Sequence, residues 1–406
     1  MQGSDAKERL QASIGLEVAL LVLLCSSDIE ICSSAITCFG HICEEAQLTD
    51  YIDDPHQAVL MVVENLPIYH ELSSNNSIVT GRKSQQKQIR RLLRMMTHYA
   101  PGNLAAWEEV YKRWKYMIPA MTKPYEESKD EALELSPHPH NVKRNAPTAW
   151  HDKLRNPTAS SRQTNNHASN NRTDPSPSNV ITVTLDDDKS SEWQNYAGFL
   201  AALGGICLMA DVGPSTPTSP SGTRSAFGDS MTVRRVSAPS ESSAMVNRFV
   251  VDMVDLLLCD NIMIREWVKE ILGTDLSPAL YSVLFRYMET VLSKYFGPDG
   301  DPICSASNTL FVEQAISVLK LILDRMEGSY ENLLTVDFSG LIDQYAKYLN
   351  KLGNSQSALK IKIKFCQLVE VLMMKKDKIT LRQEFRLRNK LLEIIVEWTS
   401  DFSLVS

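Results

Sequence analysis

A dense run of basic side chains between residues 82 and 94 is the strongest candidate for binding chemistry in this sequence. No acidic residue lies between Glu71 and Glu108, so the run carries a local positive charge. Such a cluster can bind a phosphate-bearing lipid, an RNA or an acidic protein. It can also be the solvated face of a helix whose cations pair with acids of a neighbouring helix. The candidate residues are Arg82, Lys83, Lys87, Arg90, Arg91 and Arg94.

Apolar residues alternate with these cations at the spacing of an α-helix, which favours the second interpretation. The spacing predicts one buried stripe, with Arg90, Arg91 and Arg94 off that stripe and on the surface. The stripe consists of Ile89, Leu92, Leu93, Met96 and Ala100.

The dipeptide Pro101-Gly102 predicts a break, and Asn103 is a suitable N-cap for the next helix. That helix has its own apolar stripe, so its aromatic residues are expected in a core, where they cannot stack on bases. We therefore expect no nucleic acid as a partner. The stripe consists of Trp107, Val110, Tyr111, Trp114 and Ile118.

Four cysteines and a histidine near the N-terminus suggest zinc as a ligand. Zinc ligands usually come in pairs two to four residues apart, and the gaps between these cysteines are wider. Neighbouring isoleucines predict instead that the thiols are buried as small apolar groups. We expect no metal and no cofactor, and we assign His138 and His140 to a linker. The N-terminal residues are Cys25, Cys32, Cys38, Cys43 and His41.

The tetrapeptide RRVS places Arg234 and Arg235 shortly before Ser237, in the arrangement that basophilic kinases recognise. Phosphorylation would add about −1.5 to −2 charges beside the two arginines. Ser237 is therefore the candidate modification site.

The sequence contains none of the common motifs for nucleotide binding or hydrolysis. It has no P-loop, no GxSxG, no HExxH and no glycine-rich dinucleotide turn. No nucleophile, base and oxyanion hole come together in any recognisable pattern. We predict no catalytic residue.

Apolar periodicity predicts an all-α protein, built as a HEAT- or armadillo-like helical array and interrupted by two long inserts. The inserts are rich in Ser, Asn, Thr and Pro, so they bury too little apolar surface to offset roughly 1–2 kcal/mol per residue of ordering entropy. We expect both to be disordered. The predicted regions are helical repeats at 1–121, an insert at 122–190, a buried helix at 191–212, a loop at 213–243 and helical repeats at 244–402.

Residues that start helices give further predictions. Ser191 and Gln194 form a capping box ahead of the buried helix, and the alternating ITVTLDDD before it resembles a short strand. Ser277 as N-cap and Pro278 at the first helical position open a long helix.

Two glycines are expected to end helices. Gly273 should stop the helix before Ser277, and Gly353 should stop another. Thr380 with Gln383 forms a capping box that would open the last helix.

Bulk composition fits a folded protein of the cytoplasm. The 406 residues are 43% hydrophobic with a net charge of −7, which argues against a protein devoted to nucleic acid. Eight cysteines occur without a CxxC pair, and no clear secretory signal precedes them, so we expect reduced thiols. The longest uncharged apolar stretch, at 196–210, is shorter than the roughly 20 residues needed to cross a bilayer.

Several stretches together resemble neurofibromin and its fungal relatives, the Ras GTPase-activating proteins. The resemblance covers roughly 80–210 and 245–400, and the matching segments occur in order. It implies the helical region immediately N-terminal to the GTPase-activating domain, and it does not imply that domain itself. The segments are QIRRLLRMMTHYAPGNLAAWEEVYKRW, EWQNYAGFLAALGGICL, GTDLSPALYSVLF, NTLFVEQAISVLKLILD, IKIKFCQLVEVLMMKKD and FRLRNKLLEIIVEW.

The catalytic arginine of that family has no convincing counterpart in this chain. In the family a loop arginine enters the Ras active site and stabilises the transferring phosphoryl group. The family sets that arginine in a Leu-Phe-Arg-Gly-Asn-Ser-like context. Here Leu284-Phe285-Arg286 resembles its start, but Tyr287-Met288-Glu289 follows and the run falls within a regular helical pattern. We expect no catalytic role for Arg286.

The sequence thus predicts a non-catalytic helical scaffold of a neurofibromin-like negative regulator of Ras, tuned by phosphorylation of its inserts. The resemblance implies a Ras-family GTPase as an indirect partner, through an adjacent activating domain, and a homodimer. The alternative is an adaptor that binds a membrane or RNA through residues 82–94. The expected location is cytoplasmic, or peripheral at an anionic membrane surface.

Overall fold

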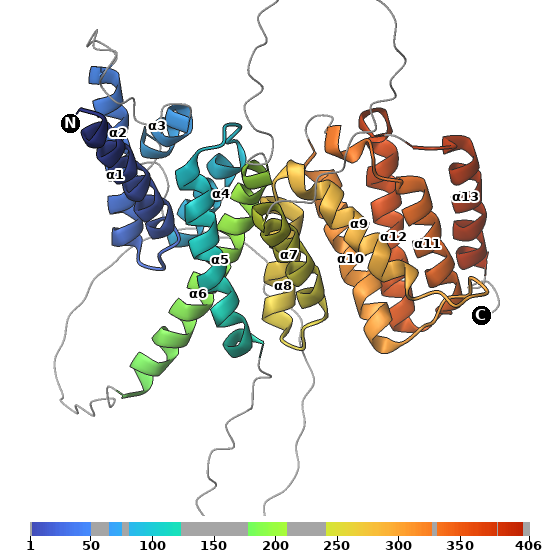
Figure 1. Ribbon diagram of the computed structural model, residues 1–406. Helices are drawn as coiled ribbons and strands as arrows, with labels where there is room; N and C mark the ends of the chain where they lie inside the picture. Colours follow the sequence, from blue (N-terminus) through green and yellow to red (C-terminus); the bar gives the residue numbers. More distant parts are fainter. Residues whose placement is uncertain are drawn as a thin grey trace, which may run out of the picture. The chain divides into compact units, whose positions relative to one another are not determined.

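The computed structural model describes residues 2–49, 65–74, 81–122, 178–208, 241–326, 331–379 and 381–400, and these are helical nearly throughout (Figure 1). Within those ranges there is no β-strand, and one isolated bridge joins Phe296 and Pro302. The predicted all-α helical array is confirmed. The candidate phosphorylation site Ser237, His138 and His140 lie outside the described residues.

Five helices form the N-terminal part: α1 (Gln2–Leu23), α2 (Ile29–Thr49), α3 (Leu66–Ser74), α4 (Arg82–Arg94) and α5 (Pro101–Met121). Helix α1 packs against α2 and α5, α2 packs against α3, and α3 packs against α4. The rings of Phe39 and Tyr69 stack 4.3 Å apart between α2 and α3. The predicted stripe on α4 is confirmed, because Ile89, Leu92 and Leu93 are all buried.

Helix α5 begins earlier than predicted. Ala100 is its N-cap residue and Pro101 occupies the first turn, where the missing N–H leaves no helical hydrogen bond unmade. Asn103 was expected to cap this helix, but it lies inside the helix and is fully buried.

Helix α6 (Ser178–Cys207) is one continuous helix and corrects two predictions. Ser191 lies in its interior and is not an N-cap, and the stretch ITVTLDDD at 181–188 is helical and not a strand. The insert expected at 122–190 is therefore helical from Ser178 onward, while 123–177 and 209–240 lie outside the described residues. Within the region predicted as a buried helix at 191–212, α6 continues to Cys207, and Trp193, Phe199 and Leu203 are buried.

An aromatic cluster joins α5, α6 and α7 (Glu241–Asp255). Trp114 lies 5.1 Å from Phe249 and 6.1 Å from Trp193, measured between ring centroids. Trp107 is fully buried, and its indole N–H donates to the carbonyl of Leu200 at 3.0 Å. These aromatic side chains belong to the core, as predicted.

Helix α8 (Ile262–Glu270) continues into a π-helical turn, Ile271–Asp275, and does not stop at Gly273. Gly273 is needed there for a different reason. A Cβ atom at this position would lie 2.5 Å from Cβ of Leu321, so only glycine allows the turn to approach α10 (Ala306–Asp324) this closely. A 3₁₀ turn, Pro278–Leu280, then leads into α9 (Tyr281–Ser293), with Pro278 in the predicted first position.

The last four helices pack in a repeating pattern. Helix α10 contacts α12 (Gln356–Met374), and α11 (Phe338–Lys351) contacts α13 (Glu384–Ser400). Each helix therefore packs on the helix two positions along the chain, as stacked helical pairs do. Gly353, with φ 76°, follows α11 as predicted.

The start of α13 differs from the prediction. The helix begins at Glu384, and Gln383 precedes it with φ 53°, so Gln383 is not the third residue of a capping box. Thr380, the predicted N-cap, lies outside the described residues.

Helix α10 is the one helix of the described part that is long and apolar enough to cross a bilayer by length and composition. Its buried residues include Phe311, Leu319 and Ile322, which belong to the protein core. Because a core helix meets the same criteria, this finding is weak evidence for a membrane span.

The described helices up to Thr122, the part of α6 from Leu185, and the helices from α7 onward form one compact unit. A second unit comprises Tyr125–Thr184, of which only residues 178–184 are described, and these are helical.

Candidate functional site

The basic helix α4 is docked by two buried glutamines on the face next to its apolar stripe. The side-chain amide of Gln86 donates to the carbonyl of Leu24 at 2.8 Å, and that of Gln85 donates to Oγ of Ser33 at 3.1 Å. Leu24 follows the end of α1, where backbone carbonyls lack helical partners. The amide of Gln86 therefore satisfies a helix end and fixes α4 against it.

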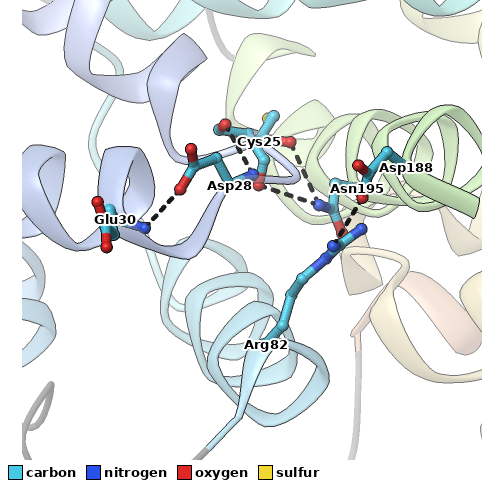
Figure 2. A network of polar contacts seen from close by, with 7 residues as sticks. Cys25, Asp28, Glu30, Arg82, Asp188 and Asn195 are labelled. Atoms are coloured by element: carbon cyan, nitrogen blue, oxygen red, sulfur yellow. Dashed lines mark hydrogen bonds and ion pairs between the residues drawn. The ribbon is translucent and has the colours of Figure 1, made fainter. Parts of the chain in front are cut away.

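The same corner between α1 and α2 is held from the other side by α6. Nδ2 of Asn195 lies 3.2 Å from the carbonyl of Cys25 and 3.4 Å from that of Ser26 (Figure 2). Oδ1 of Asp28 accepts the backbone N–H of Glu30 at 2.8 Å and so caps the start of α2. Amide and carboxylate groups thus satisfy backbone groups at the end of α1 and at the start of α2.

The first cation of α4 also contacts α6. Nη1 of Arg82 lies 3.0 Å from Oδ1 of Asp188, and Figure 2 shows the two side chains meeting below the α1–α2 corner. About half of the Asp188 side chain is exposed. An ion pair this exposed contributes at most about 1 kcal/mol.

Three cations at i, i+3 and i+7 form one row along α4 and face the end of α8 and its π-helical turn. Nζ of Lys87 lies 3.0 Å from Oε1 of Glu270, and Nε of Arg90 lies 2.7 Å from Oδ2 of Asp275. Nη1 of Arg94 donates to the carbonyl of Thr274 at 2.7 Å. The C-terminal end of a helix carries partial negative charge, so the row complements both the carboxylates and the free carbonyls. We call these three residues and their partners the α4–α8 seam.

Arg90 is the buried member of the seam. Its side chain is 6% exposed and that of Asp275 is 13% exposed, so the prediction that Arg90 lies on the surface is wrong. A Cβ atom on Gly198 would lie 2.2 Å from Cδ of Arg90. The Arg90 side chain therefore packs directly against the backbone of α6 at Gly198, where a larger residue would clash with it. The carboxylate of Asp275 compensates its charge.

Lys83, Lys87 and Arg91 are the exposed members of the cluster, although Lys87 pairs with Glu270 in the seam. Nη2 of Arg91 lies 3.6 Å from Oε1 of Glu71 on α3, a long contact with a 69% exposed side chain. Lys83 is exposed and has no ion-pair partner among the described residues. The six candidate cations thus do not form one free patch, because most of them contact acids or carbonyls of neighbouring helices.

The N-terminal cysteines lie where the sequence predicted, with one exception. Cys25, Cys32 and Cys43 are buried, whereas Cys38 is exposed. Burial raises the pKa of the Cys32 thiol to about 11, so this thiol stays protonated and unreactive. His41 contacts Glu44 at 3.3 Å, and no group of three metal-binding side chains occurs among the residues that the structure describes.

Arg286 lies within α9, one turn before Thr290, whose hydroxyl donates to the Arg286 carbonyl at 2.7 Å. Its backbone is therefore part of a regular helix, and no loop carries it.

Sequence reasoning missed a buried polar cluster that joins α1, α3 and α5. The hydroxyl of Tyr69 donates to Oε1 of Glu17 at 2.6 Å, and Nδ2 of Asn103 lies 3.3 Å from the same oxygen. Asn65 donates to Oδ1 of Asn103 at 3.0 Å. Burial raises the pKa of Glu17, while the hydrogen bonds from Tyr69 and Asn103 oppose that shift. The signal was its spacing: Glu17 falls on the same helical stripe as the buried Leu20, Leu21 and Leu24.

A second missed cluster surrounds Asp252 of α7. Its carboxylate contacts Nζ of Lys115 at 2.5 Å and Nε of Arg248 at 3.0 Å, and accepts from the Tyr111 hydroxyl at 3.3 Å. Burial, followed by the charge of Asp252, raises the pKa of Tyr111 to about 12. An open depression of about 460 Å³ lies beside this cluster, between the ends of α5 and α7.

The fold and the contacts of α4 define the class of protein. It is an α-helical array in which a basic helix packs against neighbouring helices of the same chain. Comparison with known proteins gives a distant relationship and no family assignment. No family model matches the chain. The chain is 22% identical over 217 residues to the inhibitory regulator protein IRA2 of Saccharomyces cerevisiae. This match covers 53% of the chain and 7% of the relative, so the chain spans only a small part of that protein.

Proposed function

We propose that this chain is a non-catalytic helical scaffold of a neurofibromin-like regulator that lowers Ras activity. The distant relationship to an inhibitory regulator protein supports the regulatory class. The observation that favours a scaffold is the α4–α8 seam, in which the strongest cluster of cations holds helices together. Proteins that use basic clusters to bind ligands keep those cations accessible.

Arg286 supports the non-catalytic part of the proposal. A catalytic arginine of this kind must extend from a mobile loop into a partner's active site. Arg286 is held in the middle of α9, whose opposite face buries Leu284, Phe285 and Met288. In this proposal, acceleration of GTP hydrolysis belongs to an activating domain elsewhere in the regulator, and Ras is an indirect partner of the residues described here.

A single-turnover GTP hydrolysis assay with purified Ras tests this function. We expect the chain to leave the rate within about twofold of the intrinsic value, whereas a GTPase activator raises it by about 10³–10⁵. Acceleration by the chain that is lost in an Arg286→Ala variant would refute the scaffold proposal. A positive control with an authentic activating domain confirms that the Ras preparation responds.

The alternative, an adaptor for an anionic membrane or RNA, depends on the cations that remain exposed. Lys83, Lys87 and Arg91 are accessible, and Arg82 is partly accessible. Vesicles containing phosphatidylserine, or a single-stranded RNA, serve as probes in a sedimentation or anisotropy assay across a salt series. Tight, steeply salt-dependent binding that is lost in Lys83→Glu/Arg91→Glu would favour the adaptor. We expect weak binding, because the row facing α8 is already compensated.

A further inference from the structure

The connection between α12 and α13 carries the opposite charge to the chain as a whole. Residues 374–388 contain six cations and two acids, whereas the whole chain has a net charge of −7. Four of these cations are exposed, so the connection presents an excess of positive charge to solvent. The exposed cations are Lys376, Arg382, Arg386 and Arg388.

Hydrogen bonds to neighbouring helices hold this connection in place. Nζ of Lys375 donates to the carbonyl of Met326, just after α10, at 2.8 Å. The hydroxyl of Ser339, in the first turn of α11, donates to the carbonyl of Arg382 at 2.8 Å. Helices α10 and α12 therefore end, and α11 and α13 begin, along one edge of the array (Figure 1). The basic connection is part of that edge.

Two large apolar side chains lie at the ends of the connection. Met374, the last residue of α12, is 69% exposed, and Phe385, in the first turn of α13, is 80% exposed. Nζ of Lys376 lies 3.3 Å from Oε1 of Glu384. This contact brings the two ends of the connection together, and with them the two apolar side chains. The surface is therefore both basic and apolar.

Nearby carboxylates compensate only part of this charge. One carboxylate of the connection is shared by two of the exposed cations, at 3.3 and 3.8 Å. Across the edge, Asp324 is paired within α10 and Asp337 accepts a backbone N–H at the start of α11, which leaves Glu331. Arg382 and Arg386 have no ion-pair partner among the residues that the structure describes. These two arginines are available to an anionic ligand.

Exposed apolar side chains beside unpaired arginines fit the surface of an anionic bilayer. The cations bind the head groups, while the apolar side chains enter the boundary with the acyl chains. An RNA would pair with the same cations and would stack a base on Phe385, but it offers no hydrocarbon to Met374. The combination of the two apolar side chains therefore favours lipid over RNA.

We propose that the connection between α12 and α13 binds an anionic lipid bilayer, with Arg382 and Arg386 at the head groups and Met374 and Phe385 in the interface. Binding is weak and reversible, because stable attachment to a bilayer needs more than one such anchor. The surface is separate from the basic residues 82–94. The inference goes beyond the proposed function and holds or fails independently of the Ras assay.

Co-sedimentation of the 406-residue chain with vesicles tests the proposal. We expect binding to phosphatidylcholine vesicles that contain about 30% phosphatidylserine, a steep loss of binding between about 50 and about 500 mM salt, and no binding to phosphatidylcholine alone. Arg382→Glu/Arg386→Glu should weaken binding about tenfold or more, since each cation close to an anionic surface contributes about fivefold.

The matched control is Lys83→Glu/Arg91→Glu, which makes the same charge change at exposed positions of α4. This variant should bind the vesicles as the wild type does. Equal losses in the two variants, no binding at low salt, or equal binding to neutral vesicles would overturn the proposal.

An environment-sensitive dye locates the contact. Met374→Cys, in a background in which the exposed Cys38 and Cys304 are replaced by serine, is labelled with a nitrobenzoxadiazole dye. Its emission should rise and shift to the blue on anionic vesicles, because the dye enters the bilayer. The dye on Lys112→Cys, at an exposed position of α5, should not respond. An unchanged spectrum at position 374, or tighter binding to a single-stranded RNA that the double arginine variant loses, would contradict the assignment to lipid.

Discussion

The guanidinium of Arg90 lies 2.7 Å from the carboxylate of Asp275, although the two residues belong to helical segments far apart in the sequence. Both side chains are largely buried. The pair therefore connects α4 to the end of the α8 helix in an environment largely shielded from solvent, and it gives Arg90 a structural role within the basic segment.

Removing one member of this pair should be strongly destabilising. Arg90→Ala leaves Asp275 with an uncompensated, mostly buried charge, and we expect a loss of about 3–5 kcal/mol in the free energy of unfolding. Arg91→Ala, at the next position but exposed, should change it by about 0.5 kcal/mol or less. Urea denaturation followed by circular dichroism measures both. Similar effects from the two variants would mean that Arg90 is not compensated in the way described.

Glycine should be required at position 198 for stability only because the Arg90 side chain packs against it. A methyl group on Gly198 would lie 2.2 Å from Cδ of Arg90, so Gly198→Ala should displace the arginine and destabilise the fold by about 1–3 kcal/mol. In an Arg90→Ala background the same change should cost much less, since the clash is gone. A double-mutant cycle from four denaturation curves measures this coupling, and strictly additive losses would argue against the contact.

Trp107→Ala should destabilise the fold by about 3–5 kcal/mol, because it removes a fully buried indole that packs on Phe249. It also removes the hydrogen bond to the Leu200 carbonyl. Tyr116→Ala on the same helix provides the control, since that side chain is 87% exposed and should contribute little. Thermal melts of the two variants, checked by urea denaturation, compare them. A stable Trp107→Ala variant would show that the aromatic cluster is not part of the core.

Glu17 should make stability depend on pH. Burial raises its folded-state pKa above the ordinary value of 4.5, so the folded protein holds this proton more tightly than the unfolded chain does. The contribution of Glu17 is therefore fully present below pH 4.5 and is lost as pH rises through the folded-state pKa. Glu17→Gln cannot titrate. The stability of the wild type relative to Glu17→Gln should fall as pH rises from below the ordinary pKa of 4.5 through the raised folded-state pKa. Denaturant melts across this range test the sign, and a difference that stays constant or rises would contradict it.

Helical periodicity alone predicted the elements and much of the core. The stripe that includes Ile89, Leu92 and Leu93 is buried as expected, because apolar residues that recur every 3.6 residues lie on one face of a helix and that face packs on the core. The ends of helices were harder to predict from the sequence. Ser191 and Asn103 are good N-cap residues in isolation, but tertiary packing extends α6 and α5 past them.

The candidate site could be predicted only in part from the sequence, because tertiary packing also decides which of its side chains are buried. The local spacing shows that Arg90 lies off the apolar stripe of α4. It does not show that the end of α8 and its π-helical turn pack over that face of α4. Gly198 and Asp275, which make the burial of Arg90 possible, are distant in sequence and have no pattern that links them to it. Glu17 was missed because a charged residue among leucines is usually at the surface.

Helix α6 is bounded in the sequence by two long polar stretches, yet the indole of Trp193 and the carbonyl of Leu200 are enclosed by residues of α5 and its neighbours. Limited proteolysis within 123–177 and 209–240 should therefore yield a nicked assembly and not separate fragments. The pieces would co-elute under native conditions and part only in denaturant, so the peptide connections on either side of α6 are dispensable once the protein has folded.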